Sequence, residues 1–429
     1  FAPDATATMP VGITPGKIYY VRNPSGTTFN ISATPSGALV QVTVAAVGTC
    51  RILSNAYLLS SNAAASSVPT QQNYLLVSDI NRFVFAFGCN DYGSVTVDPM
   101  LIRWSNQEDP YNWTPDATNQ AGSVRLSHGS KIVATVQTRQ EIFVLTDSSA
   151  YSLQYLGPPY VWQSQLLGDN ISIASQNAAI IASGVVYWMG VDKFYAYDGR
   201  VNTLNCDLRR HVFNDFNLSQ RAQVYAGTNE AFNEVWWFYC SANSTLIDKY
   251  VVYNYLEKIW YYGTMSRSAW LDSGLLANPI ATTYNPTTQV GRLINHESGL
   301  NDNTDGTDYA IDAYISSSEF DIGDGHNFGF VWRIIPDLTF SNSLSAPDGT
   351  TPRVTMTIAG LYNSGSGRID NASGLVAKSS SYLLAEEFTG QIFTRIRGRQ
   401  MVFQIESNQI NTCWQLGAPR IDIKPDGRR

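Results

Sequence analysis

Two adjacent carboxylates, Glu108 and Asp109, lie between Trp104 and Trp113 in the stretch RWSNQEDPYNWTP. Paired acids beside aromatic rings are typical of glycosidases, whose two carboxyl groups face each other across the sugar at about 5–10 Å. Neighbours on an extended segment instead point to opposite sides, and Pro110 favours an extended or turn conformation at the residue before it. We therefore predict a structural turn, in which the tryptophans close the ends of two inner strands and the acids are solvated.

The segment NDNTDGTDYAID (301–312) offers oxygen ligands at spacings that resemble a calcium loop. The candidates are Asn301, Asn303, Asp305 and Asp312, with a glycine at the sixth position. The usual first Asp and last Glu are both replaced, and no flanking helices are evident. Asn and Asp form metal-free Asx turns far more often. We predict neither a metal site nor a cofactor.

His326 lies near Asp321 and Asp324 in the stretch DIGDGHNFG, but no nucleophile is indicated as its partner. A catalytic triad cannot be argued from one histidine among many serines, so we predict a turn. The four histidines are too scattered to suggest a zinc site. These residues predict that the protein is not an enzyme.

Arginines at period two give the clearest charged pattern, in FTRIRGRQ. On a strand, Arg395, Arg397 and Arg399 would share one face. Three interpretations remain open for that face: a solvated surface, a stripe that meets carboxylates of a neighbouring subunit, or a contact with nucleic acid. The C-terminal stretch PRIDIKPDGRR adds a second basic patch for docking. Its members are Arg420, Lys424, Arg428 and Arg429.

Composition limits the class of protein. Only 15% of residues are charged, and Tyr, Trp, Phe, Ser, Thr, Asn and Gly are plentiful, which favours β-sheet with many turns. A net charge of −7 argues against a general DNA grip, because such binding uses a basic surface. No apolar run is long enough to span a bilayer, and the first residues do not form an intact signal peptide.

Five cysteines are present without CxxC spacing, which favours reduced, mostly buried thiols and folding in a cytoplasm. They are Cys50, Cys89, Cys206, Cys240 and Cys413.

The elements that position these residues are predicted to be strands. Residues 11–48 alternate well and predict a module of hairpins, with Ile18, Tyr20, Phe29 and Ile31 on one face. A Ser- and Ala-rich joint follows at 60–73. From about residue 74, short meanders of three or four strands recur about every 45–55 residues, which favours propeller blades over stacked sandwiches.

Longer alternating strands follow residue 308. We predict an all-β chain with three domains: an N-terminal β module (1–60), a β-propeller (61–305) and a C-terminal β-sandwich-like domain (306–429). The only helix expected is a short one near residues 206–217.

The chain also resembles a known family. The stretches WSNQEDPYNWTP, TRQEIFVLTDSSAYSLQYLGPP, VVYWMGVDKFYAYDGRV, NEVWWFYCS, YNYLEKIWYYGT and GAPRIDIKPDGRR are similar to the tail hub or nozzle proteins of short-tailed bacteriophages. These proteins are also described as packaged-DNA stabilisation or head-completion proteins. The motifs are strand and turn patterns, specific together and weak singly.

This resemblance implies a propeller body and a hexameric ring below the portal–adaptor stack of the virion. The ring would close a channel that retains double-stranded DNA and later conducts it, without recognising its sequence. Portal and adaptor proteins would be partners, and so could tail fibres or spikes. Assembly would take place in the bacterial cytoplasm. A terminal nozzle and an intermediate hub both remain open.

Two other hypotheses compete with a ring subunit. One is a tail-associated depolymerase or glycosidase propeller, which requires spaced carboxylates around a single cleft. The other is a carbohydrate-binding or host-receptor module. A ring subunit instead requires a large surface between subunits and acidic residues along an inner wall.

Overall fold

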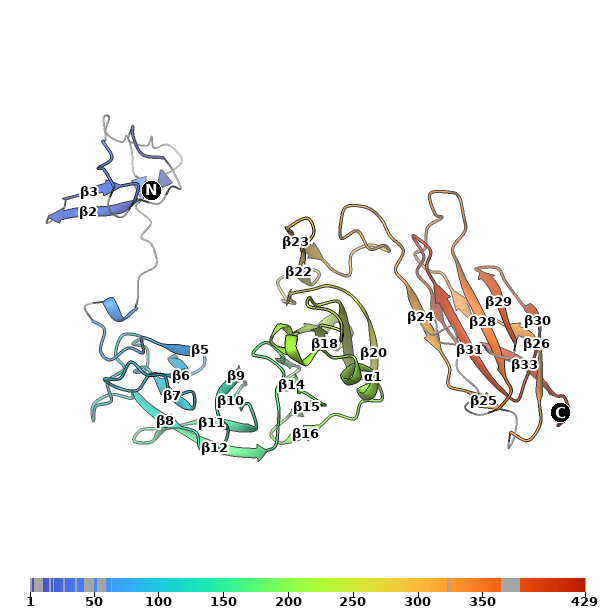
Figure 1. Ribbon diagram of the computed structural model, residues 1–429, viewed down its shortest axis with the longest axis horizontal. Helices are drawn as coiled ribbons and strands as arrows, with labels where there is room; N and C mark the ends of the chain where they lie inside the picture. The colour runs from blue at the N-terminus through green and yellow to red at the C-terminus, as the bar shows by residue number, and fades with distance from the viewer. Residues whose placement is uncertain are drawn as a thin grey trace. The chain divides into compact units, whose positions relative to one another are not determined.

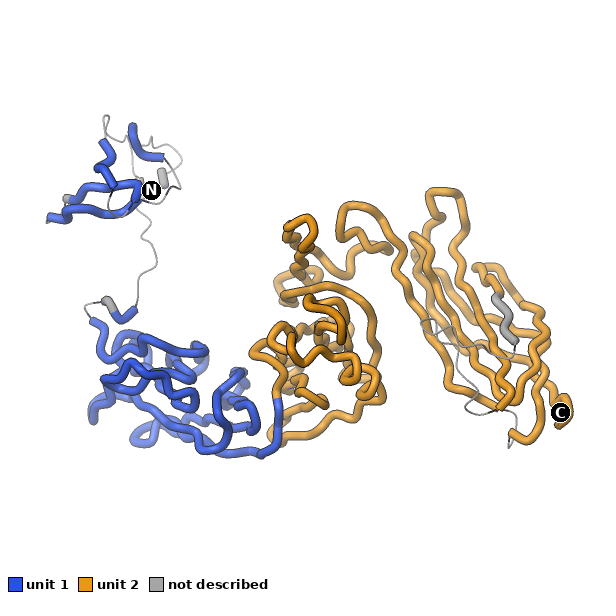
Figure 2. Tube along the Cα trace, in the orientation of Figure 1, with its two compact units in different colours: residues 1–172 blue, residues 173–429 orange. Residues whose placement is uncertain are grey.

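The chain is built almost entirely of antiparallel sheets (Figure 1). The computed structural model describes residues 2–3, 11–14, 17, 19–25, 28–34, 37–41, 50–51, 59–62, 64–321, 325–363 and 379–428. The chain packs into two compact units, residues 1–172 and 173–429 (Figure 2). The all-β prediction is confirmed. The division into three domains stays a prediction.

The N-terminal part contains short antiparallel pairs. Strand β1 (Ala2–Pro3) pairs with β4 (Cys50–Arg51), and β2 (Tyr20–Ser25) pairs with β3 (Thr28–Ser32). The register places Val21 opposite Ile31, so Tyr20 lies on the other face of the hairpin from Ile31. The predicted hairpin is therefore confirmed, but the shared face of Tyr20 and Ile31 is wrong. Ile18 lies outside the described residues.

Unit 1 continues with two four-stranded meanders, in which each strand pairs with the next along the chain. A short 3-10 helix, η1 (Leu59–Ser61), precedes them. The first sheet comprises β5 (Gln72–Ser78), β6 (Phe83–Cys89), β7 (Leu101–Trp104) and β8 (Gly122–Arg125). The second comprises β9 (Ile132–Gln137), β10 (Glu141–Thr146), β11 (Ser149–Gly157) and β12 (Val161–Asp169).

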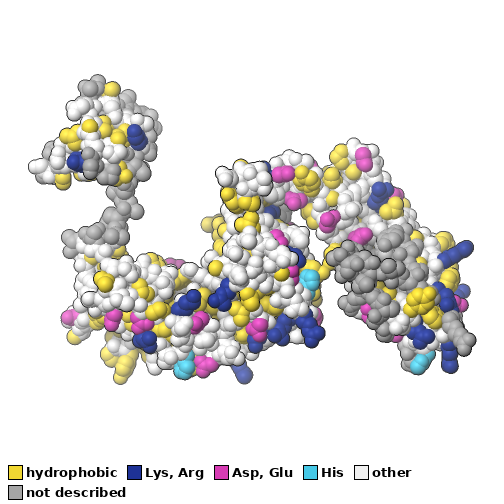
Figure 3. Space-filling view, viewed as in Figure 1, with side chains coloured by type: hydrophobic (Ala, Val, Ile, Leu, Met, Phe, Trp, Pro, Cys, Tyr) yellow, Lys and Arg dark blue, Asp and Glu magenta, His cyan; other side chains and the backbone are white. Residues whose placement is uncertain are grey.

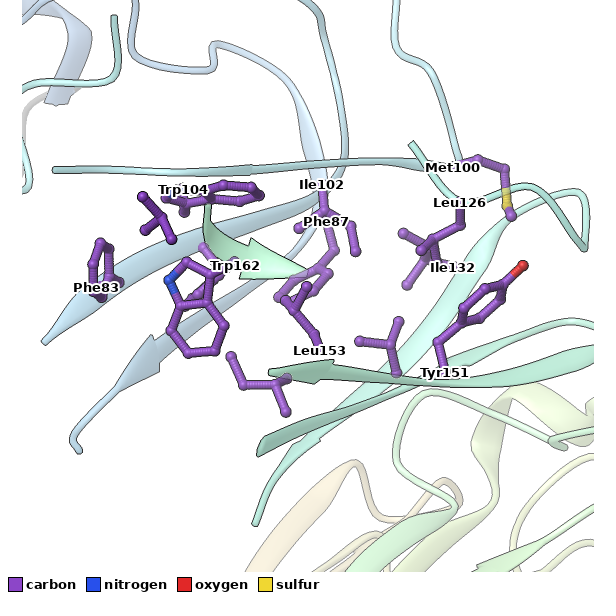
Figure 4. Close-up of a cluster of buried hydrophobic side chains, with 14 residues drawn as sticks. Phe83, Phe87, Met100, Ile102, Trp104, Leu126, Ile132, Tyr151, Leu153 and Trp162 are labelled. Carbon is purple, nitrogen blue, oxygen red and sulfur yellow. The ribbon is translucent and has the colours of Figure 1, made fainter. Parts of the chain in front are cut away.

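A shared aromatic core joins these two sheets. The inner strand β6, with the sequence FVFAFGC, is buried along nearly its whole length, whereas β5 alternates between exposed and covered residues. Phe83 of β6 meets the ring of Trp162 from β12 edge to face, with centroids 5.6 Å apart (Figure 4). Phe85 meets the same ring in the same way at 4.9 Å. This burial against a second sheet is what stabilises each short meander.

Unit 2 begins with two more four-stranded meanders and one three-stranded sheet. The third sheet comprises β13 (Ala179–Ala182), β14 (Val185–Met189), β15 (Phe194–Tyr197) and β16 (Val201–Thr203). The fourth comprises β17 (Tyr225–Asn229), β18 (Glu234–Tyr239), β19 (Lys249–Asn254) and β20 (Ile259–Thr264). The fifth comprises β21 (Ala269–Leu271), β22 (Ile280–Asn285) and β23 (Val290–Asn295).

Three short helices lie in this part of unit 2, the first two between the third and fourth sheets and the last between β17 and β18. They are α1 (Arg209–Asn214), η2 (Leu218–Gln223) and η3 (Glu230–Phe232). Helix α1 lies within the stretch for which the sequence predicted a short helix. Among the described residues, no helix is both long and apolar enough to cross a membrane.

Aromatic rings again fill the space between successive sheets of unit 2. Trp236 of β18 stacks on Trp270 of β21 with centroids 5.4 Å apart and planes inclined by 16°. A Cβ on Gly227 of β17 would lie 2.5 Å from the Trp270 ring, so only glycine lets the first strands of these sheets approach so closely. The first strand of one sheet also contacts the first strand of the next in the pairs β5–β9, β13–β17 and β17–β21.

The C-terminal part consists of two main sheets around one core. One comprises β24 (Ala313–Ser316), β25 (Phe320–Asp321), β28 (Arg353–Leu361), β29 (Ser379–Glu386) and β31 (Gln400–Ser407). The other has the order β30 (Ile392–Gly398), β26 (Gly329–Ile335) and β33 (Arg420–Pro425). A two-stranded pair, β27 (Leu338–Thr339) and β32 (Gln415–Leu416), accompanies them. Alternate residues of both sheets form the core, among them Val331, Met356 and Ile396.

Candidate functional site

Strand β30 presents its arginines on the side opposite the core. Thr394 and Ile396 point inward and are buried, whereas Phe393 is 63% exposed and Arg395 is exposed. Arg397 continues this outer row and is partly covered. The period-two pattern thus places Arg395 and Arg397 on one face, as predicted.

Arg399 does not belong to that row. Strand β30 ends at Gly398, and Arg399 lies in the turn before β31, where its N–H donates to the carbonyl of Leu361 at 2.7 Å. Its guanidinium lies over the ring of Phe328 at 5.2 Å, and that of Arg397 lies over the same ring at 4.4 Å, so the two side chains still share a neighbour. The expectation of three arginines on one strand is therefore wrong for Arg399, because β30 ends before it.

The second predicted basic patch lies on the same sheet. In β33, Ile421 and Ile423 pack toward the core, so Arg420, Asp422 and Lys424 point outward. Strands β30 and β33 flank β26 on its two sides. Two stretches more than twenty residues apart in sequence are thereby brought to one surface.

A β-bulge adds aromatic side chains to this surface. The register of β26 against β33 shifts between Val331 and Arg333, so Trp332 and Arg333 both point outward. Trp332 stacks on Phe393 with ring centroids 6.4 Å apart. Lys424 and Arg333 lie over the Trp332 ring at 5.3 and 4.7 Å, distances typical of cation–π contacts.

We name this surface the arginine face. It comprises Phe330, Trp332, Arg333, Phe393, Arg395, Arg397, Arg420, Asp422 and Lys424. Arg428 is exposed beyond the end of β33, and Arg429 lies outside the described residues. Lys and Arg side chains are visible on the surface that carries these C-terminal strands (Figure 3).

Only part of the positive charge is neutralised within the chain. The guanidinium of Arg333 donates to Asp422 at 2.6 Å, and Arg397 pairs with Asp426. Among the described residues, Arg395 and Arg420 form neither an ion pair nor a side-chain hydrogen bond. Their free guanidinium groups suit carboxylates or phosphates of another molecule, and the aromatic rings supply apolar contact area.

The tryptophan-bracketed acids lie in a turn. Trp104 and Trp113 are buried, and their indole N–H groups donate to the carbonyls of Gln120 and Pro110 at 2.8 Å. Glu108 is exposed and pairs with the equally exposed Arg82. Asp109 accepts a hydrogen bond from the backbone N–H of Tyr111 at 3.1 Å. Both carboxylates contribute to a hollow of about 300 Å³, where their contacts are those of turn residues.

The residue that holds this corner together was not predicted from the sequence. Arg103 is buried, lies over the ring of Tyr92 at 3.8 Å and donates to the carbonyl of Asn90 at 2.9 Å. It also donates to the carbonyl of Ser67, so the predicted linker packs along the first sheet. The sequence feature that could have indicated this role is an arginine within the otherwise apolar run LIRW.

Residues of the calcium-like loop are used in hydrogen bonds within the protein, some in local turns and some to a distant segment. Asp305 accepts from the N–H of Thr307 at 2.9 Å, and Asn301 exchanges hydrogen bonds with Asn411 at 2.7 Å. Asn303 donates to Asp308, and Asp312 is exposed. Across the described part of the chain, no three His, Cys, Asp or Glu side chains are placed to hold a metal ion.

The histidine candidates are likewise separated. His326 is exposed just after Asp321, and Asp324 lies outside the described residues. His296 accepts a hydrogen bond from Arg267 at 2.9 Å, and burial together with this guanidinium lowers the pKa of His296 to about 4.

A buried carboxylate links the fourth sheet to the aromatic core. Glu234, only 9% exposed, accepts hydrogen bonds from the Tyr261 hydroxyl and from the Trp236 indole N–H, the latter at 3.0 Å. Burial raises the pKa of Glu234, and the charge of Glu297 adds to this rise, while the two hydrogen bonds oppose it. Glu297 in turn accepts from Asn229 at 3.1 Å. These hydrogen bonds hold Glu234 against the aromatic side chains of its own sheet.

Comparison with known proteins adds little. No family model matches the sequence, and no curated protein matches it. Among solved structures, the chain is similar to the extracellular domain of a B. thetaiotaomicron protein described as a proposed one-component system. The two are 12% identical over 78% of this chain and 47% of that one, with a TM-score of 0.30. The chain thus spans about half the length of that structure, and this weak likeness supports no inference.

Proposed function

We propose that this chain is a structural virion protein of a short-tailed phage. In this proposal it is a ring-forming tail hub or nozzle subunit, which closes the portal–adaptor channel, retains packaged DNA and conducts it during ejection. It is not an enzyme. The resemblance of its strand and turn motifs suggests this role, and the arginine face is the observation that carries it.

The repeated meanders support a propeller body. Within each unit, successive sheets pack on one another through aromatic layers, and the first strands of consecutive sheets are neighbours. This is how blades are arranged around a propeller axis. We propose that the five sheets close around such an axis in the assembled particle.

The arginine face supports a docking role. Interfaces between proteins are enriched in Arg, Trp and Phe, and this face carries all three on one rigid sheet. Its unpaired Arg395 and Arg420 would meet carboxylates of an adjacent subunit or of the adaptor. A subunit that docks in this way is held in register by charge, with the aromatic rings excluding water.

A net charge of −7 for each chain supports the proposed role in conducting DNA. A channel that holds DNA through many phosphate contacts would bind it tightly and slow its passage. An acidic ring would repel the DNA backbone and let the duplex slide.

Native mass spectrometry and electron microscopy of the purified protein test the proposal, together with deletion of the gene in the phage that carries it. We expect a ring with a central channel, and virions without the protein should lose their packaged DNA. A monomer that turns over host polysaccharide would instead favour the depolymerase hypothesis and overturn the proposal.

A further inference from the structure

Charge is strongly segregated along the C-terminal third of the chain. Residues 293–332 contain eight acidic residues and no lysine or arginine, whereas residues 393–429 contain seven basic and three acidic residues. The first segment therefore has a net charge of −8 and the second of +4. One chain thus carries two oppositely charged surfaces.

The acidic segment has an ordered, exposed centre, which we name the aspartate tract (residues 302–312). Its four acidic members, Asp302, Asp305, Asp308 and Asp312, are all exposed. Asp302 pairs with Tyr309 in an antiparallel bridge and accepts from the N–H of Thr304 at 3.0 Å. These local turns fix the backbone and present the carboxylates to solvent.

Apolar side chains are interspersed with these carboxylates. Tyr309 and Ile311 are 51% and 54% exposed, and Tyr314, just beyond the tract, is 52% exposed. The tract therefore combines aspartates with exposed rings and aliphatic groups, as the arginine face combines arginines with Trp332 and Phe393. The arginine face carries an excess of positive charge and the aspartate tract an excess of negative charge, and both expose apolar area that association would cover.

We propose that the arginine face of one copy binds the aspartate tract of a second copy. In this contact, Arg395 and Arg420 donate to Asp308 and Asp312, and Phe393 and Trp332 pack against Tyr309 and Ile311. The inference rests on the proposed ring function and specifies the surfaces that would form the ring. The two surfaces differ, so the contact is head-to-tail, and a head-to-tail contact closes into a ring when its rotation allows.

A charge exchange between two variants tests this pairing. The face variant is R395E/R420E, and the tract variant is D308K/D312K. Alone, each variant opposes like charges across the contact, so we expect self-association at least tenfold weaker than that of the wild type. Mixed in equal amounts, they should assemble again, because each altered surface then meets its complement on the other variant. Native mass spectrometry of the mixture should show complexes that contain equal numbers of the two variants, as alternation around a ring requires.

The variant R139E/R200E is the matched control for the face variant. It makes the same change in net charge at two exposed arginines outside the C-terminal sheets. It should assemble like the wild type, and circular dichroism should show all the variants folded.

The possible outcomes distinguish a failure of the proposed contact between the two surfaces from a failure of the proposed ring. A wild-type protein that stays monomeric overturns the ring and this contact with it. A wild-type ring that survives both charge reversals, or a mixture that fails to reassemble, overturns only the contact. A face variant that assembles normally but no longer binds a duplex DNA fragment would assign the arginine face to nucleic acid instead.

Discussion

The guanidinium of Arg397 binds the carboxylate of Asp426 and donates to its backbone carbonyl at 2.9 Å, although the two residues are 29 positions apart. The pair ties the end of β30 to the segment that follows β33. The charge of Arg397 is therefore neutralised by an ion pair within the chain, in contrast to that of Arg395.

Replacement of Arg397 by Gln should lower stability slightly. Both partners are partly exposed, so the pair is worth about 0–1 kcal/mol, and the loss should shrink as salt screens the charges. Chemical denaturation of R397Q, D426N and the double variant would measure the coupling. Equal effects of R397Q and R395Q on stability would contradict the pairing.

In the tryptophan-bracketed turn, the acidic side chains should contribute less to the free energy of unfolding than the tryptophans. Trp113→Ala removes a ring that is 1% exposed and should cost about 3–5 kcal/mol. Glu108→Gln breaks only an exposed ion pair and should cost about 0–1 kcal/mol. Denaturant midpoints of the two variants provide the comparison. A large loss of stability in E108Q would contradict the solvated turn.

Glu234→Gln should change how stability depends on pH. Because burial raises the folded pKa of Glu234 above its unfolded value, the folded state keeps the proton to a higher pH. The wild type therefore loses stability as pH rises from about 4.5 through the folded pKa. The advantage of E234Q over the wild type should grow across that window, by about 1.4 kcal/mol for each unit between the two pKa values.

Urea unfolding at several pH values measures this difference. The exposed Glu257→Gln is the control, because it removes one carboxylate that is not buried. An E234Q advantage that is constant with pH would mean that folding does not shift the pKa of Glu234, and it would contradict the effect of burial.

Thiol alkylation should distinguish the described cysteines. Cys413 is exposed, whereas burial raises the pKa of Cys89 and Cys240 to about 11 and that of Cys206 to about 12. At neutral pH, a rise of two units leaves roughly a hundredfold less thiolate, the reactive form. Intact-mass measurements should show Cys413 modified first, and C413S should lack this fast phase.

Alternation and turn composition predicted the fold class and most meanders from sequence. The run AAIIASGVVYWMGVDKFYAYDGR, for example, contains β13, β14 and β15 with the turns where Gly, Asp and Lys occur. Register could not be predicted in the same way, because Tyr20 and Val21 are both suitable for a buried face. The cross-strand pairing of Val21 with Ile31 decides between them.

The candidate site was predicted only in part. The spacing of Arg395 and Arg397 indicated a shared face, but nothing local to β30 or β33 indicated that both flank β26. Trp332 and Arg333 point to the same side only because a bulge breaks the alternation, and the strand pattern alone contains no sign of it. Long-range pairing and bulges thus limited what the sequence could show.

The stacked indoles of Trp236 and Trp270 give this protein an optical reporter. Two nearly parallel rings this close couple their electronic transitions, which adds a paired signal to the far-ultraviolet circular dichroism spectrum. One ring belongs to the fourth sheet and the other to the fifth, so the signal requires that these sheets are packed together. Separation of the fifth sheet would therefore be visible in the spectrum before the strands themselves unfold.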